Sequence, residues 1–170
     1  MATKILPKKL TLSTEIDVYA SSSELKKSDF ELLQKAQKAV ESAYAPYSNF
    51  YVGAAVLLEN GKIICGNNQE NAAYPSGLCA ERVAIYQASA IYPNIPVKAI
   101  AIACKAKGLI VNKPISPCGG CRQAISEYEN HFSQKIKIIM SGEIGEVYVS
   151  DSIENLLPLM FSAKYLPKRK

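Results

Sequence analysis

Two cysteine-containing stretches place the strongest constraint on how this chain can fold. Residues 77–82 read Gly-Leu-Cys-Ala-Glu-Arg, and residues 117–121 read Pro-Cys-Gly-Gly-Cys. Cys79, Cys118 and Cys121 would supply three soft thiolate ligands to one zinc ion, and three protein ligands leave a fourth position open for water. We therefore expect a fold that brings these two stretches, about forty residues apart, to one point.

The local spacing of the cysteines predicts that both stretches begin helices. Cys118 and Cys121 are three positions apart and precede an amphipathic run, so the first turn of a helix would direct both side chains toward one ion. Cys79 and Glu81 are two positions apart, which in mid-helix would point them about 200° from each other. They can share a site only where a helix begins, and we expect that helix to begin at Gly77.

The number of ligands and the presence of Glu81 favour an open, catalytic metal site over a structural one. Helix N-termini favour thiolate over thiol, and Arg82 is placed to donate to a thiolate and offset the negative charge of three of them. A structural zinc site would be closed by a fourth protein ligand, and no fourth cysteine or histidine stands at a suitable spacing. Glu81, in contrast, lies where a proton carrier is wanted.

The cysteine motifs and the sequence around them resemble one family of enzymes. Cys-Ala-Glu followed by Pro-Cys-Gly-Gly-Cys resembles the zinc deaminase signature, with cysteine where many relatives carry histidine. In order along the chain come Ala-Pro-Tyr-Ser-Asn-Phe-Tyr-Val-Gly-Ala-Ala at 45–55, Asn-Gln-Glu-Asn-Ala at 68–72 and Leu-Leu-Pro at 156–158. Over roughly residues 29–161 the chain resembles the small, homotetrameric, three-cysteine cytidine deaminases.

The resemblance implies a reaction and a cofactor. It implies hydrolytic deamination of cytidine and 2′-deoxycytidine to uridine and 2′-deoxyuridine plus ammonia, a reaction of pyrimidine salvage, with one zinc per subunit. Zinc would lower the pKa of its bound water, and Glu81 would take the proton as water attacks C4 of the pyrimidine. Glu81 would then protonate ring N3 and the departing amine, while backbone N–H groups around Ala80 hold the base carbonyl.

Five further residues take on roles only through the resemblance. Asn68 and Glu70 would hold the sugar hydroxyls, and Phe50 and Phe161 would line the pyrimidine pocket, the second from a neighbouring subunit. Tyr74 would lie at the subunit interface of a homotetramer. In isolation, the polar pair also fits a solvated loop and the two phenylalanines also fit a hydrophobic core.

Two other classes of function stay open. One is a deaminase with the same site that acts on a polynucleotide base, guanine or an aminocytosine antibiotic. The other is a non-catalytic zinc module that binds a partner. The formal charge of +5 does not require a nucleic-acid partner, because residues 29–154 carry eleven basic and twelve acidic groups and the excess lies in the tails.

Composition predicts one domain in the cytoplasm. The chain has 170 residues with 48% hydrophobic content, enough for one sizeable core. We expect an N-terminal extension at 1–28, the deaminase-like domain at 29–161 and a basic C-terminal tail at 162–170. No apolar run approaches the roughly eighteen residues of a membrane span, no signal peptide opens the chain, and five cysteines at these spacings favour reduced thiols.

Hydrophobic periodicity predicts an α/β fold, a three-layer helix-sheet-helix sandwich around a mixed sheet of about five strands. The expected strands are 50–58, 62–68, 97–104, 135–141 and 146–150. A first helix capped by Ser28 or Asp29 would run until Pro46 stops it, and a short helix would follow at 153–157. Alternating apolar residues at 10–18 fit either a short strand or a partly ordered arm.

Overall fold

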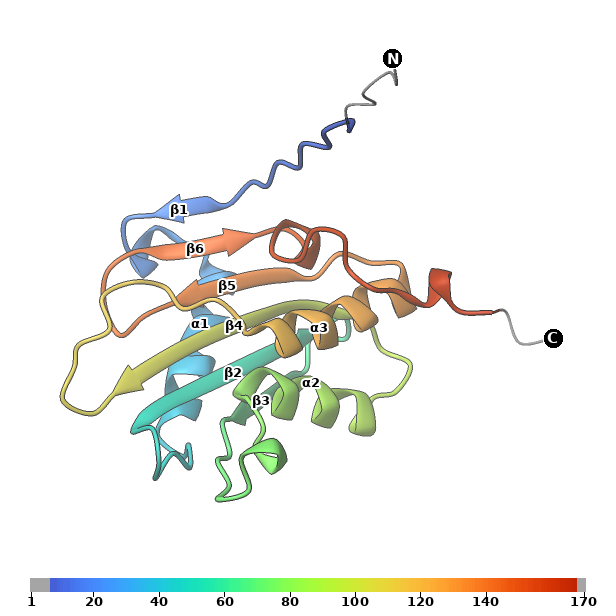
Figure 1. The fold of residues 1–170 in the computed structure, drawn as a ribbon. Coiled ribbons are helices and arrows are strands. Elements are labelled where there is room, and N and C mark those ends of the chain that lie inside the picture. Colours follow the sequence, from blue (N-terminus) through green and yellow to red (C-terminus); the bar gives the residue numbers. More distant parts are fainter. Residues whose placement is uncertain (1–6, 168–170) are drawn as a thin grey trace, which may run out of the picture.

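The computed structural model describes residues 7–167, which form one sheet with helices on both faces (Figure 1). The strands are β1 Asp17–Tyr19, β2 Phe50–Leu58, β3 Ile63–Asn67, β4 Val97–Ala106, β5 Lys137–Ser141 and β6 Val147–Ser150. The α-helices are α1 Lys27–Val40, α2 Ala80–Ile91 and α3 Gly119–Phe132. Short 3₁₀ helices lie at Ser22–Glu24, Tyr74–Ser76, Ile153–Asn155 and Ala163–Tyr165. Within residues 7–167 no helix is long and apolar enough to cross a membrane.

The sheet is mixed, as expected, and its strand order is β1-β6-β5-β4-β2-β3. Strands β4 and β5 are parallel and are joined through α3, while every other neighbouring pair is antiparallel. Strands β2 and β3 form the predicted hairpin, which turns at Gly61 with a φ of 78°. The parallel pair requires the crossover that places α3 beside the sheet.

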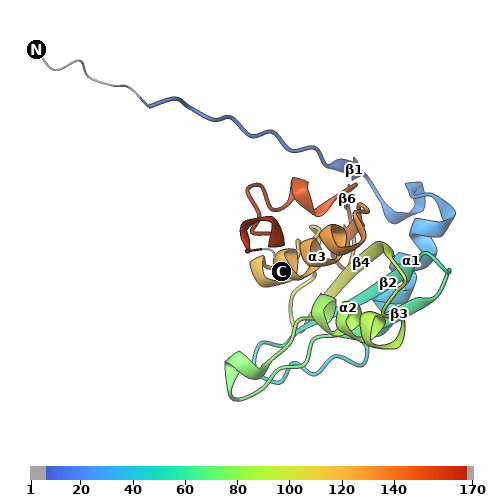
Figure 2. The same ribbon diagram turned by 90° about the vertical axis from the view of Figure 1, so that its right-hand side faces the viewer.

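Strand β4 separates two hydrophobic layers. Ile100 and Ile102 face a core shared with α2 and α3, whereas Ala99 and Ala101 face a core shared with α1. All four side chains are buried, which explains the continuous apolar run seen in the sequence. The three-layer sandwich is therefore confirmed, with α1 on one face and α2 and α3 on the other (Figure 2).

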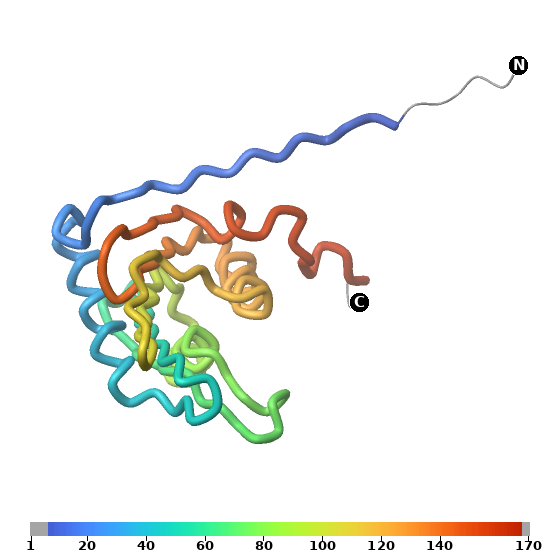
Figure 3. Tube along the Cα trace, turned by 60° about the vertical axis from the view of Figure 1, so that its left-hand side comes forward, coloured from blue at the N-terminus to red at the C-terminus, as the bar shows by residue number. Residues whose placement is uncertain are grey.

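The sheet has six strands rather than about five because residues 17–19 add an edge strand. Asp17 pairs with Val149 and Tyr19 pairs with Val147, both antiparallel. The strand expected at 10–18 is thus only three residues long, and residues 7–16 run away from the body as an extended segment (Figure 3). Leu10 on that segment is exposed.

Helix α1 starts earlier than its sequence predicted. It begins at Lys27, and neither Ser28 nor Asp29 caps it, because both lie inside its first turn. Asp29 instead pairs with Lys137 at an O–N distance of 2.9 Å, which ties α1 to β5. The helix ends at Val40, several residues before Pro46.

Helix α2 begins at Ala80, so the expected start at Gly77 is wrong. Leu78 exchanges two backbone hydrogen bonds of 2.9 Å with Gln69, which keeps the chain extended up to Cys79. Cys79 then serves as the N-cap with an extended backbone, φ −71° and ψ 153°. The segment expected to be helical at 153–157 is a 3₁₀ turn over Ile153–Asn155.

Strand β3 approaches α2 closely at Gly66. A Cβ atom there would lie 2.5 Å from the backbone N of Ala84 and 2.8 Å from the carbonyl O of Ala80. Only glycine leaves room for this contact, because real Cβ atoms do not come so near a backbone. Gly66 therefore fixes the distance between the sheet and the first turns of α2.

Candidate active site

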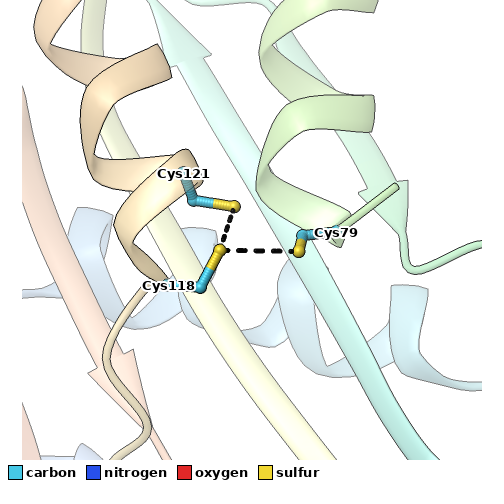
Figure 4. A group of neighbouring side chains, drawn as sticks. All are labelled: Cys79, Cys118 and Cys121. Atoms are coloured by element: carbon cyan, nitrogen blue, oxygen red, sulfur yellow. Dashed lines mark hydrogen bonds between the residues drawn. The ribbon is translucent and has the colours of Figure 1, made fainter. Parts of the chain in front are cut away.

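Three cysteine side chains meet between the N-termini of α2 and α3 (Figure 4). Cys79 and Cys118 are the N-caps of α2 and α3, and Cys121 lies in the first turn of α3. The Sγ atoms of Cys79 and Cys118 are 3.7 Å apart, and those of Cys118 and Cys121 are 3.4 Å apart. The structure thus brings together the three residues that the sequence singled out.

The sulfur geometry fits a zinc ion. Two sulfur ligands at about 2.3 Å from a tetrahedral zinc are separated by roughly 3.8 Å. The two measured separations are close to this value, and all three sulfurs lie within 4.8 Å of one another. No fourth cysteine, histidine or carboxylate joins this group among the described residues, so the donor set leaves one coordination position free.

The protein environment favours a thiolate at Cys79. Hydrogen bonding from Cys121, followed by that from Arg82, whose Nη2 lies 3.9 Å from the Cys79 sulfur, outweighs the effect of burial and lowers the pKa of Cys79 to about 5. The same contact raises the pKa of Cys121, which acts as the hydrogen-bond donor. The buried Nε of Arg82 has no hydrogen-bond partner among the described residues.

Glu81 is a buried carboxyl group beside the sulfur cluster. It lies in the first turn of α2 and is 5% exposed. Burial raises its pKa, and the negative charge of Cys79 raises it further, while Arg82 and a hydrogen bond with Cys121 act in the opposite direction. A raised pKa makes this carboxyl group a better proton acceptor than an ordinary exposed glutamate, which suits a general acid–base role.

A cavity of about 500 Å³ opens next to the sulfur cluster. Its lining includes Cys79 of the cluster and the neighbouring Arg82 together with Asn68, Glu70 and Tyr74. This volume lies within the range of small-molecule sites, and the lining offers an amide, a carboxylate and a guanidinium for polar contacts. The first cysteine stretch and the predicted sugar-binding stretch therefore line one cavity, which reaches the sulfur cluster at Cys79.

Comparison with known proteins places this site in a family. The family model described as the cytidine and deoxycytidylate deaminase zinc-binding region matches residues 26–134, which include all three cysteines. The chain belongs to the cytidine deaminase family. It is 40% identical to the cytidine deaminase of Sporosarcina psychrophila over 136 residues, which are 80% of this chain and 93% of that protein.

Two further relatives agree on sequence and fold. The chain is 39% identical to the cytidine deaminase of Halalkalibacterium halodurans over 133 residues, covering 78% of this chain and 93% of that protein. The crystal structure of cytidine deaminase from Burkholderia pseudomallei superposes with a TM-score of 0.68 at 37% identity, over 81% of this chain and 100% of that one. The deaminase-like fold predicted from the sequence is confirmed.

Asn68 and Glu70 are held by hydrogen bonds on one wall of the deaminase cavity. The Asn68 amide donates to the carbonyl of Phe50 at 2.9 Å and accepts from the N–H of Val52 at 2.8 Å. The Glu70 carboxylate accepts from the backbone N–H groups of Tyr47 and Ser48 and from the Ser48 hydroxyl. These bonds, the hydroxyl first, lower the pKa of Glu70, and both side chains keep spare capacity for a ligand.

Of the remaining predicted site residues, Tyr74 lines the cavity, whereas Phe50, Ala80 and Phe161 do not. Phe50 begins β2 and is half-buried, and Ala80 is fully buried at the start of α2. Phe161 is 57% exposed and stacks on Tyr165 with ring centroids 6.1 Å apart. Tyr74 lines the cavity mouth and is 75% exposed.

Sequence reasoning missed the contribution of the loop at 47–48. Ser48 orients Glu70 with its hydroxyl and accepts a bond from the N–H of Phe50 at 3.0 Å. Tyr47 lines the cavity and meets Tyr74 edge-on, with ring centroids 6.0 Å apart. The available signal was the Pro-Tyr-Ser turn within 45–55, since a serine two residues before a strand can orient a side chain of a neighbouring loop.

Proposed function

We propose that the chain deaminates cytidine and 2′-deoxycytidine hydrolytically, giving uridine or 2′-deoxyuridine and ammonia, as a cytoplasmic enzyme of pyrimidine salvage. One observation carries the proposal: a three-sulfur cluster with an open coordination position lies beside a buried carboxyl group, Glu81, and a nucleoside-sized cavity. A non-catalytic zinc module would need neither the buried carboxyl group nor the cavity.

Cys79, Cys118 and Cys121 would hold one zinc ion per subunit. When bound there, zinc supplies a Lewis acid that lowers the pKa of a coordinated water to about 7. Arg82 donates toward the Cys79 sulfur, which disperses the negative charge of the thiolates. Arg82 would therefore offset part of the negative charge that three thiolates bring to a bound zinc ion.

Glu81 moves the protons of the reaction. It accepts a proton from the attacking water and delivers it to ring N3, which makes C4 more electrophilic. It then takes the proton of the new C4 hydroxyl and passes it to the exocyclic nitrogen, so the C4–N bond breaks, ammonia leaves and the C4–O bond becomes a carbonyl. Burial of Glu81 supports this role because it raises the pKa toward the value at which a carboxyl group exchanges protons readily.

The substrate would be held by the helix N-terminus and by the polar wall. The first N–H groups of α2, around Ala80, have no partner within a helix and can donate to the base carbonyl. Asn68 and Glu70 would bind the sugar hydroxyls with the hydrogen-bonding capacity left by their contacts to the chain. Phe50 would contribute to the pyrimidine pocket.

We further propose that the enzyme is a homotetramer. Phe161 and Tyr74 are large, exposed hydrophobic side chains, and such groups are typical of subunit interfaces. Phe161 would reach the pyrimidine pocket of a neighbour, and Tyr74 would lie between subunits. A closed assembly allows each chain to give and receive one such contact.

A substrate panel on one preparation tests the function. We expect kcat/KM to be high for cytidine and deoxycytidine, because hydrogen bonds from sugar hydroxyls to a charged carboxylate are worth about 1.5–3 kcal/mol. Free cytosine lacks these donors and should be poor. A single-stranded oligonucleotide places a phosphate against Glu70 and should be excluded. An oligonucleotide that turned over as well as cytidine would replace the nucleoside with a polynucleotide substrate.

A further inference from the structure

The segment after β6 is held to α3 by a small set of polar contacts. It leaves the sheet at Ser150 and lies beside α3 (Figure 1). Two of its backbone carbonyls accept bonds from consecutive residues of α3: Arg122 Nη1 donates to Leu156 O at 2.7 Å, and Gln123 Nε2 donates to Phe161 O at 2.9 Å. The backbone of Phe161 is therefore fixed by α3, while its ring stays 57% exposed.

Arg122 also holds the loop that carries the metal ligands. Its Nε donates to the carbonyl of Pro117 at 2.8 Å, and Pro117 directly precedes Cys118. A guanidinium group is planar and presents its N–H groups in a fixed fork, so its two contacts cannot move independently. One side chain thus joins the loop of the sulfur cluster to the C-terminal segment.

The position of these residues in the sequence strengthens the link. Arg122 and Gln123 follow Cys121 without a gap, so one turn of α3 carries a cluster sulfur and the two donors. Any displacement of this turn moves the sulfur and the Phe161 backbone together. Neither donor lines the cavity, so neither would touch the substrate of its own chain.

We propose that Arg122, assisted by Gln123, is a positioning residue that holds the backbone of Phe161 at a fixed position relative to the sulfur cluster. The ring that Phe161 presents to a neighbouring pocket is then placed by the same turn of α3 that places Cys121. The proposal rests on the proposed function, specifically on the assignment of Phe161 to the pyrimidine pocket of a neighbour. Arg122 would therefore govern substrate affinity through Phe161 and not through the chemical step.

The test is a double-mutant cycle between Arg122→Gln and Phe161→Ala in the zinc-loaded enzyme. Each single variant should raise the KM for cytidine by roughly three- to tenfold and leave zinc at one per chain. The double variant should be no worse than Phe161→Ala alone, because Arg122 acts through that ring. Increases in KM that multiply in the double variant would overturn the proposal, since a purely structural role predicts independent effects.

Two more variants complete the design. Gln123→Ala removes only the bond to Phe161 and should raise KM with the same dependence on Phe161, which keeps the test usable if Arg122→Gln does not fold. Lys164→Gln is the matched control, because it removes a positive charge from the same segment without a side-chain hydrogen bond among the described residues. A change in KM for Lys164→Gln equal to that of Arg122→Gln would overturn the proposal.

A second measurement separates this proposal from the proposed function. Amide hydrogen exchange at 153–161 should be faster in Arg122→Gln than in the unaltered protein, with exchange at the core of β4 unchanged, whether or not cytidine is turned over. Unchanged exchange at 153–161 would show that Arg122 does not hold the C-terminal segment in place, and it would overturn the proposal. A Phe161→Ala variant with unaltered KM would overturn both the role of that ring and the positioning role, while turnover of cytidine would still support the deaminase.

Discussion

Glu81 and Arg82 are adjacent in the sequence, yet they interact with the Cys79 thiolate in opposite ways. Arg82 donates toward the Cys79 sulfur and lowers its pKa, whereas the charge of that sulfur raises the pKa of Glu81. A base and a charge-compensating group can therefore be separated by one peptide bond at a helix start. Each can be removed by substitution without removing a sulfur.

Replacing Glu81 by glutamine should separate chemistry from metal binding. Glu81→Gln keeps the shape of the buried side chain but cannot carry a proton, so kcat for cytidine should fall by roughly 10²–10⁴-fold. Zinc content by elemental analysis and the melting temperature should stay close to those of the unaltered protein. Turnover within a few-fold of the starting enzyme would require a different proton carrier.

Replacing a cluster cysteine should remove the metal. Cys118→Ala leaves two sulfurs, so the protein should lose zinc and some thermal stability together. Cys65→Ala is the matched control, because Cys65 is an exposed thiol on β3 outside the sulfur cluster. Metal analysis that found equal zinc in both variants would show that the three cysteines do not form the site.

At the residue scale, the sequence predicted the sulfur cluster better than it predicted the side-chain contacts around it. The spacing of Cys118 and Cys121 on a helix turn, and of Cys79 and Glu81 at a helix start, requires little tertiary information because each pair is local. The hydrogen bond from Ser48 to Glu70 spans 22 positions, and nothing local encodes it. Long-range side-chain partners of this kind become visible only in the folded chain.

At the scale of elements, tertiary contacts moved the helix boundaries. Strand β2 was predicted with its observed bounds, because its apolar residues and the Gly61 turn are local signals. The start of α2 was placed three residues too early, since the backbone pairing of Leu78 with Gln69 keeps the chain extended. Because the helix begins at Ala80, Cys79 can adopt the non-helical backbone of an N-cap.

Enlarging Gly66 should disturb α2, the helix that follows Cys79 and carries Glu81. The added methyl of Gly66→Ala would meet backbone atoms of α2, which cannot rotate away, so we expect a loss of about 1–3 kcal/mol of stability and weaker zinc binding. Thermal unfolding and metal titration measure both effects. Gly120→Ala is the control for stability, because no atom lies within 4 Å of its added methyl and alanine favours a helix. Equal melting temperatures for the two variants would contradict the close contact.

At the scale of the whole molecule, the single chain exposes large apolar side chains that an assembly would cover. Leu159, Phe161, Tyr165 and Leu166 follow one another in the C-terminal part and are all more than half exposed. The hydrophobic pattern of the sequence predicted the core layers, but it does not distinguish a residue buried within the chain from one buried between chains.

Light scattering should return the mass of four chains. A shared pocket requires neighbouring subunits, so turnover per chain should fall as dilution drives dissociation, and both quantities should change over one concentration range. Sedimentation of the Phe161→Ala variant distinguishes loss of the pocket from loss of the assembly. A fully active monomer at dilute concentration would rule out a pocket completed by a neighbour.

The short strand β1 has a protective consequence for the sheet. It covers the backbone of β6, whose Val147 and Val149 are buried, and it offers in its place an edge of only three residues that includes a charged Asp17. A short, charged edge is a poor template for strand addition, whereas an uncovered β6 would present unpaired N–H and C=O groups next to apolar side chains. Removal of residues 1–20 should therefore leave the matched region at 26–134 intact and yet make the protein prone to edge-to-edge aggregation, visible as turbidity that rises with concentration.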